Sequence, residues 1–403
     1  MIPDDSVPIR DPLFVRAVAF REGGHCVAWA TLDICFVSRG LRERVLRDLA
    51  GRGVALDSVV LSATHTHTAP TGIHFNGVEH MPEDYERFLE EEVILAITEA
   101  VRTLRPAEIS YGRTCVDLSV NRRQIGRIAE VNDLRANTGL VDSEVRIAEI
   151  RILEDDHIGI LFNYAAHPLT MSREPVAISA DYPGRAIRRL RRNGFAHAQF
   201  IQGCAGNVNV KIHGHEAEAE AVGGILAEAV MAAANSAIPS KSSRVRSVSR
   251  TVHLPLTGIP ELETARRTLA EVSATKSRDA RTEGMREWAE SVVHLLERGD
   301  VRPYLEVLVQ ALRVGDAVFV ALPGEEFVET GLEIKRRAGL EDLFVAGYAN
   351  CGEIGYVATE EAWKEGGYEV EEAPFWFGPF PLSPRCARII VESALAAIAA
   401  VRD

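Results

Sequence analysis

Apolar runs of strand length alternate with amphipathic, helix-like stretches along most of this chain. The runs at 12–20 and 26–32 are joined by Glu22-Gly23-Gly24, which predicts a hairpin. Ser38 then precedes a stretch through Ala50 with apolar residues at helical spacing, which predicts a capped helix. The same signals predict further strands at about 58–63, 107–120, 145–153, 157–165, 198–201, 240–255, 305–313, 317–322 and 343–348. They predict further helices at about 82–104, 182–193, 216–234, 327–338 and 385–401.

This order of elements indicates a mixed fold. Hairpins and strand–helix alternation occur in one chain, so we expect an α/β fold of mixed sheets with flanking helices rather than an all-parallel sheet. The stretch 260–299 is rich in Glu, Arg, Ala and Leu and is expected to form one or two peripheral surface helices. Residues 124–140 are polar and loop-like, and a loop rich in Gly, Pro and aromatic residues is expected at 365–384. We find no internal sequence repeat.

Composition narrows the class of protein. The 403 residues are 46% hydrophobic, which is enough for a proper core. The net charge of -13 argues against a nucleic-acid partner, and no apolar run is long enough to predict a membrane span. The N-terminus lacks the apolar stretch of a signal peptide, and the six scattered cysteines form no C-x-x-C pair. We therefore expect free thiols and a cytoplasmic location.

Candidate chemistry is placed where the predicted strands end. The strand at 58–63 leads into Thr64-His65-Thr66-His67, and residues two apart on an extended chain share one face. So short a motif arises by chance and needs partners. Other strand ends supply them: His167, the neighbouring carboxylates Glu325 and Glu326, and Tyr356. Two histidines and a carboxylate with an open position are the usual catalytic zinc arrangement.

Other reactive side chains each have a structural alternative. Cys204 follows a strand and could be a nucleophile, although a small thiol packed behind its loop is favoured. His213 and His215 form a second H-x-H, for which a solvated loop is favoured over a pocket-rim or second-metal role. Asp181 either orients a ligand histidine or caps the helix that follows it. His74 and His80 are expected to be polar loop residues, although one of them could line the mouth of the pocket.

Five separated segments resemble the motifs of a known family. They are Thr64-His65-Thr66-His67-Thr68-Ala69-Pro70, Asn121-Arg122-Arg123, His167-Pro168-Leu169-Thr170-Met171, Pro323-Gly324-Glu325-Glu326-Phe327, and Tyr356-Val357-Ala358-Thr359 with Tyr368-Glu369. In this order they are similar to T-H-T-H-[ST]-G-P, N-R-S, H-P-[VT]-[ST]-M, P-G-E-F and G-Y-[VI]-T-T with a later Tyr-Glu. The chain thus resembles the neutral/alkaline ceramidases over residues 12 to about 400.

The resemblance implies a fold, a reaction and a set of roles. The fold would be a mixed α/β domain with zinc at the bottom of a pocket, and the reaction would be hydrolysis of an N-acyl amide bond. The implied zinc ligands are His65, His167, Glu325 and Tyr356, with Glu326 open as an alternative to its neighbour. His67 would handle protons or the oxyanion, and Arg122 and Tyr368 would contact the polar head of the substrate or the oxyanion.

The chain also departs from the family pattern. The family segment G-D-V-S-P-N has its serine where this chain has Asn209, so a serine nucleophile is not available. Asn209 could still donate a hydrogen bond to an oxyanion or hold a ligand in place. We expect residues 1–403 to form a single zinc-hydrolase-like catalytic domain without the C-terminal β-domain or the secretion signal of the family.

These observations lead to one leading function and two alternatives. We expect a zinc-dependent hydrolase in which metal-bound water attacks the carbonyl of a small amide (N-acyl) substrate other than ceramide. The Glu-rich, aromatic loop at 360–380 favours a small polar or cationic substrate. The alternatives are an esterase or lactonase acting on a small polar metabolite, and a non-catalytic relative that binds a small molecule. The sequence does not indicate an oligomeric state.

Overall fold

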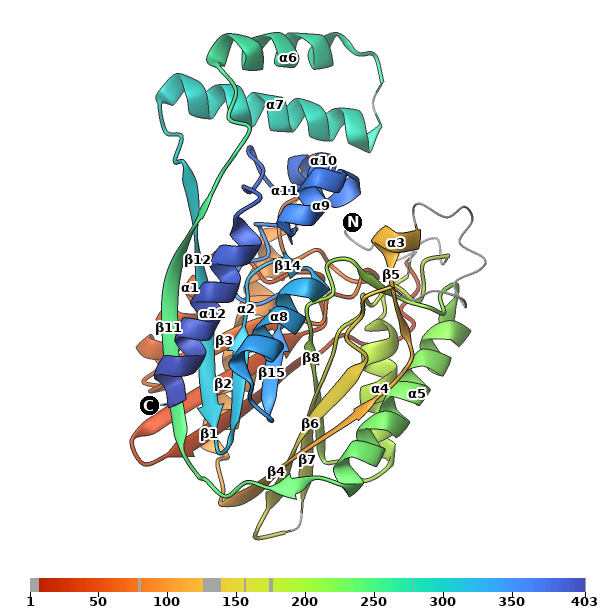
Figure 1. Ribbon diagram of the computed structural model, residues 1–403, viewed down its shortest axis with the longest axis vertical. Coiled ribbons are helices and arrows are strands. Elements are labelled where there is room, and N and C mark those ends of the chain that lie inside the picture. Colours follow the sequence, from red (N-terminus) through yellow and green to blue (C-terminus); the bar gives the residue numbers. More distant parts are fainter. Residues whose placement is uncertain are drawn as a thin grey trace.

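The computed structural model describes residues 7–78, 81–125, 139–155, 157–173, 177–277 and 279–402. His80 and most of the polar loop expected at 124–140 lie outside these residues. Three larger sheets and two short strand pairs form the interior, and helices cover the outside (Figure 1). The expected α/β fold with mixed sheets and flanking helices is confirmed.

The first sheet is built from the predicted hairpin and the strand that follows the first helix. β1 (Val15–Glu22) pairs antiparallel with β2 (His25–Leu32). α1 (Arg39–Gly51) begins after Ser38, whose Oγ accepts from the Leu41 amide as the sequence predicted. β3 (Ser58–Ala63) then returns parallel to β2, and all six of its residues are buried.

The other two large sheets repeat this topology. In the second, β6 (Glu144–Ile152) and β7 (Ile158–Tyr164) form the hairpin, α4 (Asp181–Arg192) crosses over, and β8 (His197–Gln202) lies parallel to β7. In the third, β12 (Tyr304–Val314), β13 (Ala317–Ala321), α8 (Val328–Ala338) and β15 (Leu343–Ala346) play the same parts. The three units therefore share a hairpin–helix–parallel-strand order, although their sequences show no repeat.

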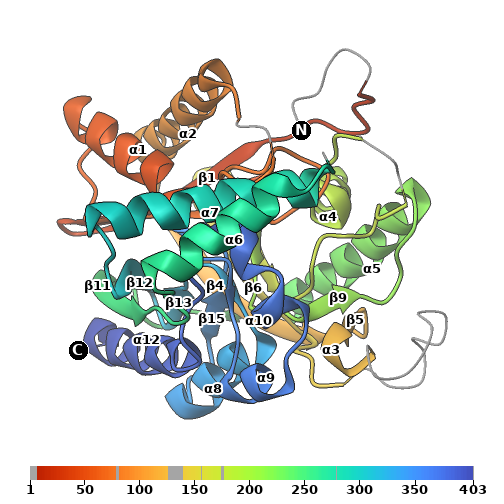
Figure 2. The same cartoon turned by 90° about the horizontal axis from the view of Figure 1, so that it is seen from above.

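Flanking strands and helices complete the layers. The second sheet is extended by β4 (Ala107–Cys115) and β10 (Ile238–Pro239), and the third by β11 (Val245–Pro255). The helices α2 (Glu83–Arg102), α5 (Glu216–Asn235) and α12 (Cys386–Arg402) join α1, α4 and α8 around the sheets (Figure 2). Among the described residues, no helix has both the length and the apolar character needed to cross a membrane.

One part of the core lies where the inner faces of the sheets meet, and the largest part lies between the sheets and the helices. Trp29 of the first sheet contacts Phe319 of the third edge-to-face, with ring centroids 6.3 Å apart, and Phe319 stacks on Phe344 at 4.2 Å. Burying such a side chain stabilises the fold by roughly 2–3 kcal/mol. This packing fixes the three units relative to one another, and with them the loops at their strand ends.

Short elements surround those loops. The pairs β5 (Ser119–Asn121) with β9 (Val208–Val210) and β14 (Glu325–Glu326) with β16 (Tyr356–Val357) lie close to the strand ends. The stretch expected to be a loop at 365–384 instead contains α10 (Tyr368–Glu371) and α11 (Pro374–Phe377), just after α9 (Glu360–Glu365). One turn of helix, α3 (Arg122–Ile125), follows β5.

A helical hairpin stands at one end of the molecule. α6 (Leu262–Ala274) and α7 (Ala280–Arg298) fall within the stretch 260–299 and lie above α9–α11 (Figure 1). Glu287 of α7 joins the hairpin to the loop after the histidine pair: its carboxylate lies 2.5 Å from His74 Nε2 and accepts from the Gly77 amide at 2.7 Å.

Candidate metal centre

Three side chains from three different units converge at one buried point. The Nε2 atoms of His65 and His167 lie 3.3 and 3.1 Å from Glu325 Oε2, respectively. All three residues are at most 2% exposed. Their ligand atoms lie within 4.8 Å of one another, so this group could hold a metal ion.

His65 is held by the first unit. It is the second residue after β3, has a left-handed backbone with φ of 66°, and its amide donates to the Ile34 carbonyl. A left-handed backbone costs a non-glycine residue roughly 1–3 kcal/mol, so the surrounding hydrogen bonds must impose it. The ring Nδ1 donates to the Cys35 carbonyl at 2.9 Å, which leaves Nε2 directed at Glu325.

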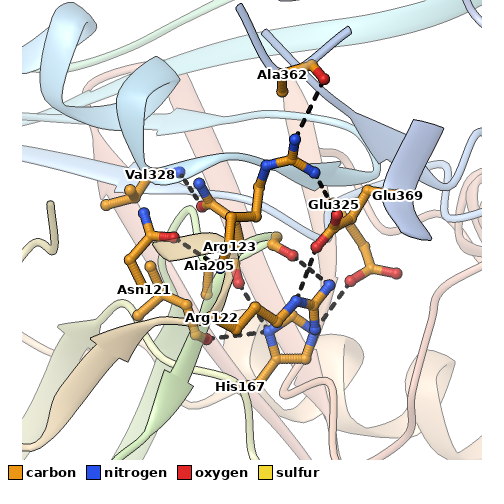
Figure 3. Close-up of polar contacts among 12 residues, drawn as sticks. Asn121, Arg122, Arg123, His167, Ala205, Glu325, Val328, Ala362 and Glu369 are labelled. Atoms are coloured by element: carbon orange, nitrogen blue, oxygen red, sulfur yellow. Dashed lines mark hydrogen bonds and ion pairs between the residues drawn. The ribbon is translucent and has the colours of Figure 1, made fainter. Parts of the chain in front are cut away.

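His167 is held in the same way by the second unit. It lies three residues after β7, and its amide donates to the Val208 carbonyl. Its Nδ1 donates to the Ala205 carbonyl at 2.7 Å (Figure 3). With Nδ1 protonated on both rings, each Nε2 turns a lone pair toward a carboxylate. A metal ion or protons must therefore lie between these atoms. Histidines that bind a metal through Nε2 have this same tautomer, with the proton on Nδ1.

Glu325 rather than Glu326 joins the two histidines. The Glu325 amide donates to the Gly355 carbonyl at 2.8 Å, and its carboxylate faces the rings. Glu326 lies on the opposite side of β14, fully buried, and neither of its carboxylate oxygens has a hydrogen-bond partner among the described residues. Burial raises the pKa of Glu326 well above its ordinary value, which disfavours the charged form of this side chain.

The electrostatics of the group follow from burial and close approach. Burial alone would raise the pKa of Glu325, but the two adjacent rings outweigh it and hold that pKa far below its usual range. Burial opposes charge on His65 as well, yet Cys35 and Glu325 raise its pKa to about 10. Burial lowers the pKa of His167 to about 4. Without a metal, a proton therefore rests between His65 and Glu325, in the place that a cation would take.

His67 stands at the solvent side of the group. Its Nε2 lies 3.2 Å from His65 Nε2, and it is the exposed member of the four. Cys35 Sγ, His65 and His67 form a second possible metal-holding trio. In that trio His65 would have to bind the metal through Nδ1, the nitrogen that faces the sulfur. Because this nitrogen already donates to the Cys35 carbonyl, the trio with Glu325 fits a metal better.

Arg122 is fixed next to this group by Glu369, a motif residue for which the sequence indicated no partner. Its Nε donates to Glu369 Oε1 at 2.9 Å, and its Nη2 donates to the Gly206 carbonyl at 2.7 Å (Figure 3). Glu369 Oε2 accepts from Arg123 at 2.6 Å, and Arg123 also donates to the Ala362 carbonyl. Glu369 is only 5% exposed, so it ties α10 to both arginines.

The two predicted tyrosines lie on the Arg122 side. Tyr356 pairs with Glu325 across β14 and β16, and the Arg122 guanidinium lies 5.3 Å from its ring centre. Burial raises the pKa of Tyr356 well above its ordinary value, against the charge of Arg122. Tyr368 meets Tyr356 edge-to-face at 6.0 Å and is 48% exposed. Both rings are thus near the group, Tyr356 inside and Tyr368 at its edge.

Asn209 lies next to His167. It is the middle residue of β9, forms a backbone bridge with His167, and has an Oδ1 atom that is buried without a hydrogen-bond partner among the described residues. An orphaned acceptor beside the group suits a ligand or an ordered water.

Sequence reasoning missed Tyr348. It follows β15, has φ of 55°, is fully buried, and its ring centre lies 4.1 Å from that of His65. Its hydroxyl has no hydrogen-bond partner among the described residues. The available signal was positional, because Tyr348 follows the parallel strand of the third unit as His65 follows that of the first.

The remaining candidates lie outside the group. Cys204 is buried against Gly331, and burial raises the pKa of its thiol well above normal, which fits the packing role and not a nucleophile. His213 contacts Ser172 at 3.1 Å, and His215 precedes α5. Asp181 is the first residue of α4 rather than its cap, and it accepts from the Thr170 and Met171 amides, which positions the loop after His167.

Comparisons with known proteins show the family of this chain. Residues 4–219 match the model of a family described as neutral/alkaline non-lysosomal ceramidase, N-terminal. Neutral ceramidases of Drosophila pseudoobscura pseudoobscura and Drosophila melanogaster are each 26% identical over 197 residues, 46% of this chain. The match spans only 28% of the length of either relative.

Solved structures extend the likeness to the whole fold. The crystal structure of neutral ceramidase from Pseudomonas aeruginosa superposes with a TM-score of 0.75 and 20% identity, over 98% of this chain and 70% of that one. A structure entitled ceramidase complexed with C2 superposes with a TM-score of 0.73 and 18% sequence identity, over 96% of this chain and 69% of that one. At these identities the superpositions show a common fold.

Proposed function

We propose, since this chain belongs to the neutral/alkaline non-lysosomal ceramidase family, that it is a zinc-dependent hydrolase of an N-acyl amide bond. The observation that carries the proposal is the convergence of His65, His167 and Glu325 with both histidine Nε2 atoms turned inward. This donor set of two imidazoles and one carboxylate is that of many catalytic zinc sites.

The proposed ligands are His65, His167 and Glu325, with Tyr356 as the fourth. The place of Tyr356 beside Glu325 in the β14–β16 pair supports its inclusion. Zinc held there would supply Lewis acidity and lower the pKa of a water molecule to about 7.

The chain's own groups would do the rest. His67, exposed and 3.2 Å from His65, would take a proton from the attacking water and return it to the leaving nitrogen. Arg122, held by Glu369, would donate to the carbonyl oxygen as charge develops there, an interaction worth roughly 3 kcal/mol. Tyr368, at the edge of the group, and Asn209, next to His167, would donate further hydrogen bonds to this oxygen. Asn209 cannot act as a nucleophile, so a water molecule must.

The surroundings support a substrate with an apolar part. A cavity of about 470 Å³ borders Tyr356, Glu369 and Phe377, and its other walls are mostly apolar. Three carboxylates of the 360–380 loop are engaged within the protein: Glu369 by two arginines, Glu372 by Arg281 at 3.2 Å, and Glu371 by the Gly367 amide. These three give no support to a cationic substrate, so we propose an uncharged N-acyl amide.

The test is hydrolysis by the protein stripped of metal and reloaded with zinc. A panel would hold N-acyl amides of increasing chain length, ceramide in mixed micelles, p-nitrophenyl esters and lactones. We expect turnover of an amide that disappears on chelation and returns with zinc. Cleavage of esters or lactones alone would replace the amidase with an esterase or lactonase. A zinc-loaded protein that binds amides without cleaving them would replace the enzyme with a binding protein.

A further inference from the structure

A second cavity, larger than the one beside Tyr356, lies away from the candidate metal group. It measures about 650 Å³, is open to solvent on one side, and is bordered by β1 and the segment before it, α2, α4 and the start of β8. None of its lining residues belongs to the group around Glu325. Cavities of this size are typical of small-molecule sites.

One part of its lining is apolar. Val15 of β1, Ala96 and Ala100 of α2, Ile187 of α4 and Ala198 of β8 contribute small or aliphatic side chains. The ring of Phe14 stands at the edge, half-exposed, with the Arg16 guanidinium 4.7 Å from its centre. This part of the cavity suits a short hydrocarbon body.

Most of the charged lining is cationic, because Arg16, Arg188, Arg191 and Arg192 border the cavity. His197 borders it as well, but burial together with the charges of Arg16 and Arg191 lowers its pKa, so its ring adds no positive charge near pH 7. The two acids in the lining are already engaged, since Asp11 pairs with Arg185 at 3.0 Å and Glu99 with Arg102 at 2.6 Å.

The arginines of α4 divide into two sets. Arg185, Arg188 and Arg189 form ion pairs with Glu216, Glu220 and Glu228 of α5, at 2.9, 2.6 and 2.6 Å. Arg191 and Arg192 have no carboxylate within ion-pair distance in the part of the chain that the structure describes. In a chain of net charge -13, two unpaired arginines at a cavity are positioned to attract an anion.

We propose that this cavity binds a small organic anion, whose carboxylate or phosphate head is held by Arg191 and Arg192 and whose apolar body lies on Ala96, Ala100 and Ile187. Guanidinium groups bind both heads through paired, charge-assisted hydrogen bonds. The proposal is independent of the hydrolase function, because the cavity and the metal group share no residue.

Isothermal titration calorimetry with octanoate and octyl phosphate tests it. The decisive variant is Arg191→Glu with Arg192→Glu, two exposed positions where the fold is expected to persist. The matched control is Arg189→Glu, on the same helix but outside the cavity lining. We expect saturable binding of at least one anion to the wild type and the control, and binding roughly tenfold weaker or more in the double variant. Ala100→Leu should weaken octyl phosphate more than inorganic phosphate.

Octanoate and octyl phosphate differ in their head groups. The tighter binder of the two therefore identifies whether the site prefers a carboxylate or a phosphate. Equal binding by the double variant and the wild type would overturn the proposal. Absence of saturable binding would also overturn it, as would equal affinity for octyltrimethylammonium. If inorganic phosphate binds as tightly as octyl phosphate, the apolar wall contributes nothing to binding. That result would also refute a site for an anion with an apolar body.

Discussion

The candidate metal group depends on how each histidine uses its two ring nitrogens. Both His65 and His167 commit Nδ1 to a backbone carbonyl, and this fixes the tautomer and the direction of Nε2. The sequence singled out both histidines that converge on Glu325, because each follows an apolar strand. It could not predict these carbonyl partners, since any residue supplies a carbonyl and only the fold brings Cys35 and Ala205 to the rings.

Glu369 is a residue whose role the sequence did not show. It follows Tyr368 in the last of the five motif segments and lies in a Glu-rich, aromatic loop, and neither feature names its partner. In the structure it joins Arg122 and Arg123, far away in sequence, and is almost fully buried. Local sequence cannot show such a long-range ion pair.

Replacing this carboxylate tests the link. Glu369→Gln leaves two partly buried guanidinium groups without their counter-charge, so we expect the free energy of unfolding in urea to fall by about 2 kcal/mol. Hydrolysis should fall at least about tenfold, because Arg122 is no longer held, while zinc content stays unchanged.

The control for this change is Glu365→Gln. Glu365 is exposed and lies 3.5 Å from Arg123, so its loss should leave both stability and turnover within error. If Glu369→Gln has the same free energy of unfolding and the same rate of hydrolysis as the wild type, Glu369 does not position Arg122.

At the scale of elements, strand and helix positions followed well from periodicity. The helix capped by Ser38 and the strand 58–63 are confirmed nearly residue for residue. The predicted hairpin is also confirmed, although its first strand, expected at 12–20, runs from Val15 to Glu22. The loop at 365–384 was misjudged, because helices of four residues such as α10 and α11 are too short to show a 3.6-residue period. The threefold topology was also missed, since it repeats strand order and not residues.

Lys335 ties the helix of the third unit to the sheet of the second. Its Nζ lies 2.6 Å from Asp142 and 2.9 Å from Glu144. Burial would raise the pKa of Glu144, but Lys335 and Arg146 hold it below its ordinary value of 4.5. A carboxylate with a lowered folded-state pKa stabilises the protein above pH 4.5, and this contribution is lost as the pH falls through the folded pKa.

We therefore expect Glu144→Gln to lower the free energy of unfolding by about 1 kcal/mol at pH 7 and by little at pH 3. Urea unfolding at the two pH values measures the difference, with the exposed Glu341→Gln as control. An equal loss at both pH values would show that the charge of Glu144 is not what matters.

Gly284 lets α7 approach the loop that follows the histidine pair. A Cβ at Gly284 would lie 2.8 Å from the Asn76 carbonyl oxygen and 3.1 Å from the Trp376 ring. Gly284→Ala should thus lower the free energy of unfolding by roughly 1–3 kcal/mol despite the better helix propensity of alanine. Thermal unfolding measures this, with the exposed Glu290→Ala on the same helix as control. Unchanged stability would mean that the hairpin and the loop are not tightly packed.

At the scale of the whole molecule, the fold class and the family were within reach of the sequence, and the placement of the parts was not. Motifs spread over five segments identify the family because their order is preserved even where identity is low. How α6 and α7 sit over α9–α11 depends on Glu287 meeting His74 and Gly77, which no local pattern predicts. The Arg191 cavity likewise exists only once α2, α4 and β1 are packed.

The central claim is that His65, His167 and Glu325 hold a metal ion, and elemental analysis of the purified protein tests it most directly. Glu325→Gln and Glu326→Gln form a matched pair, since both carboxylates are buried neighbours and only Glu325 faces the histidines. We predict about one zinc per chain in the wild type and in Glu326→Gln, and loss of the metal in Glu325→Gln with the fold retained by circular dichroism. A wild-type protein that holds no metal and takes up none after addition of zinc, or equal metal content in both variants, would contradict the account.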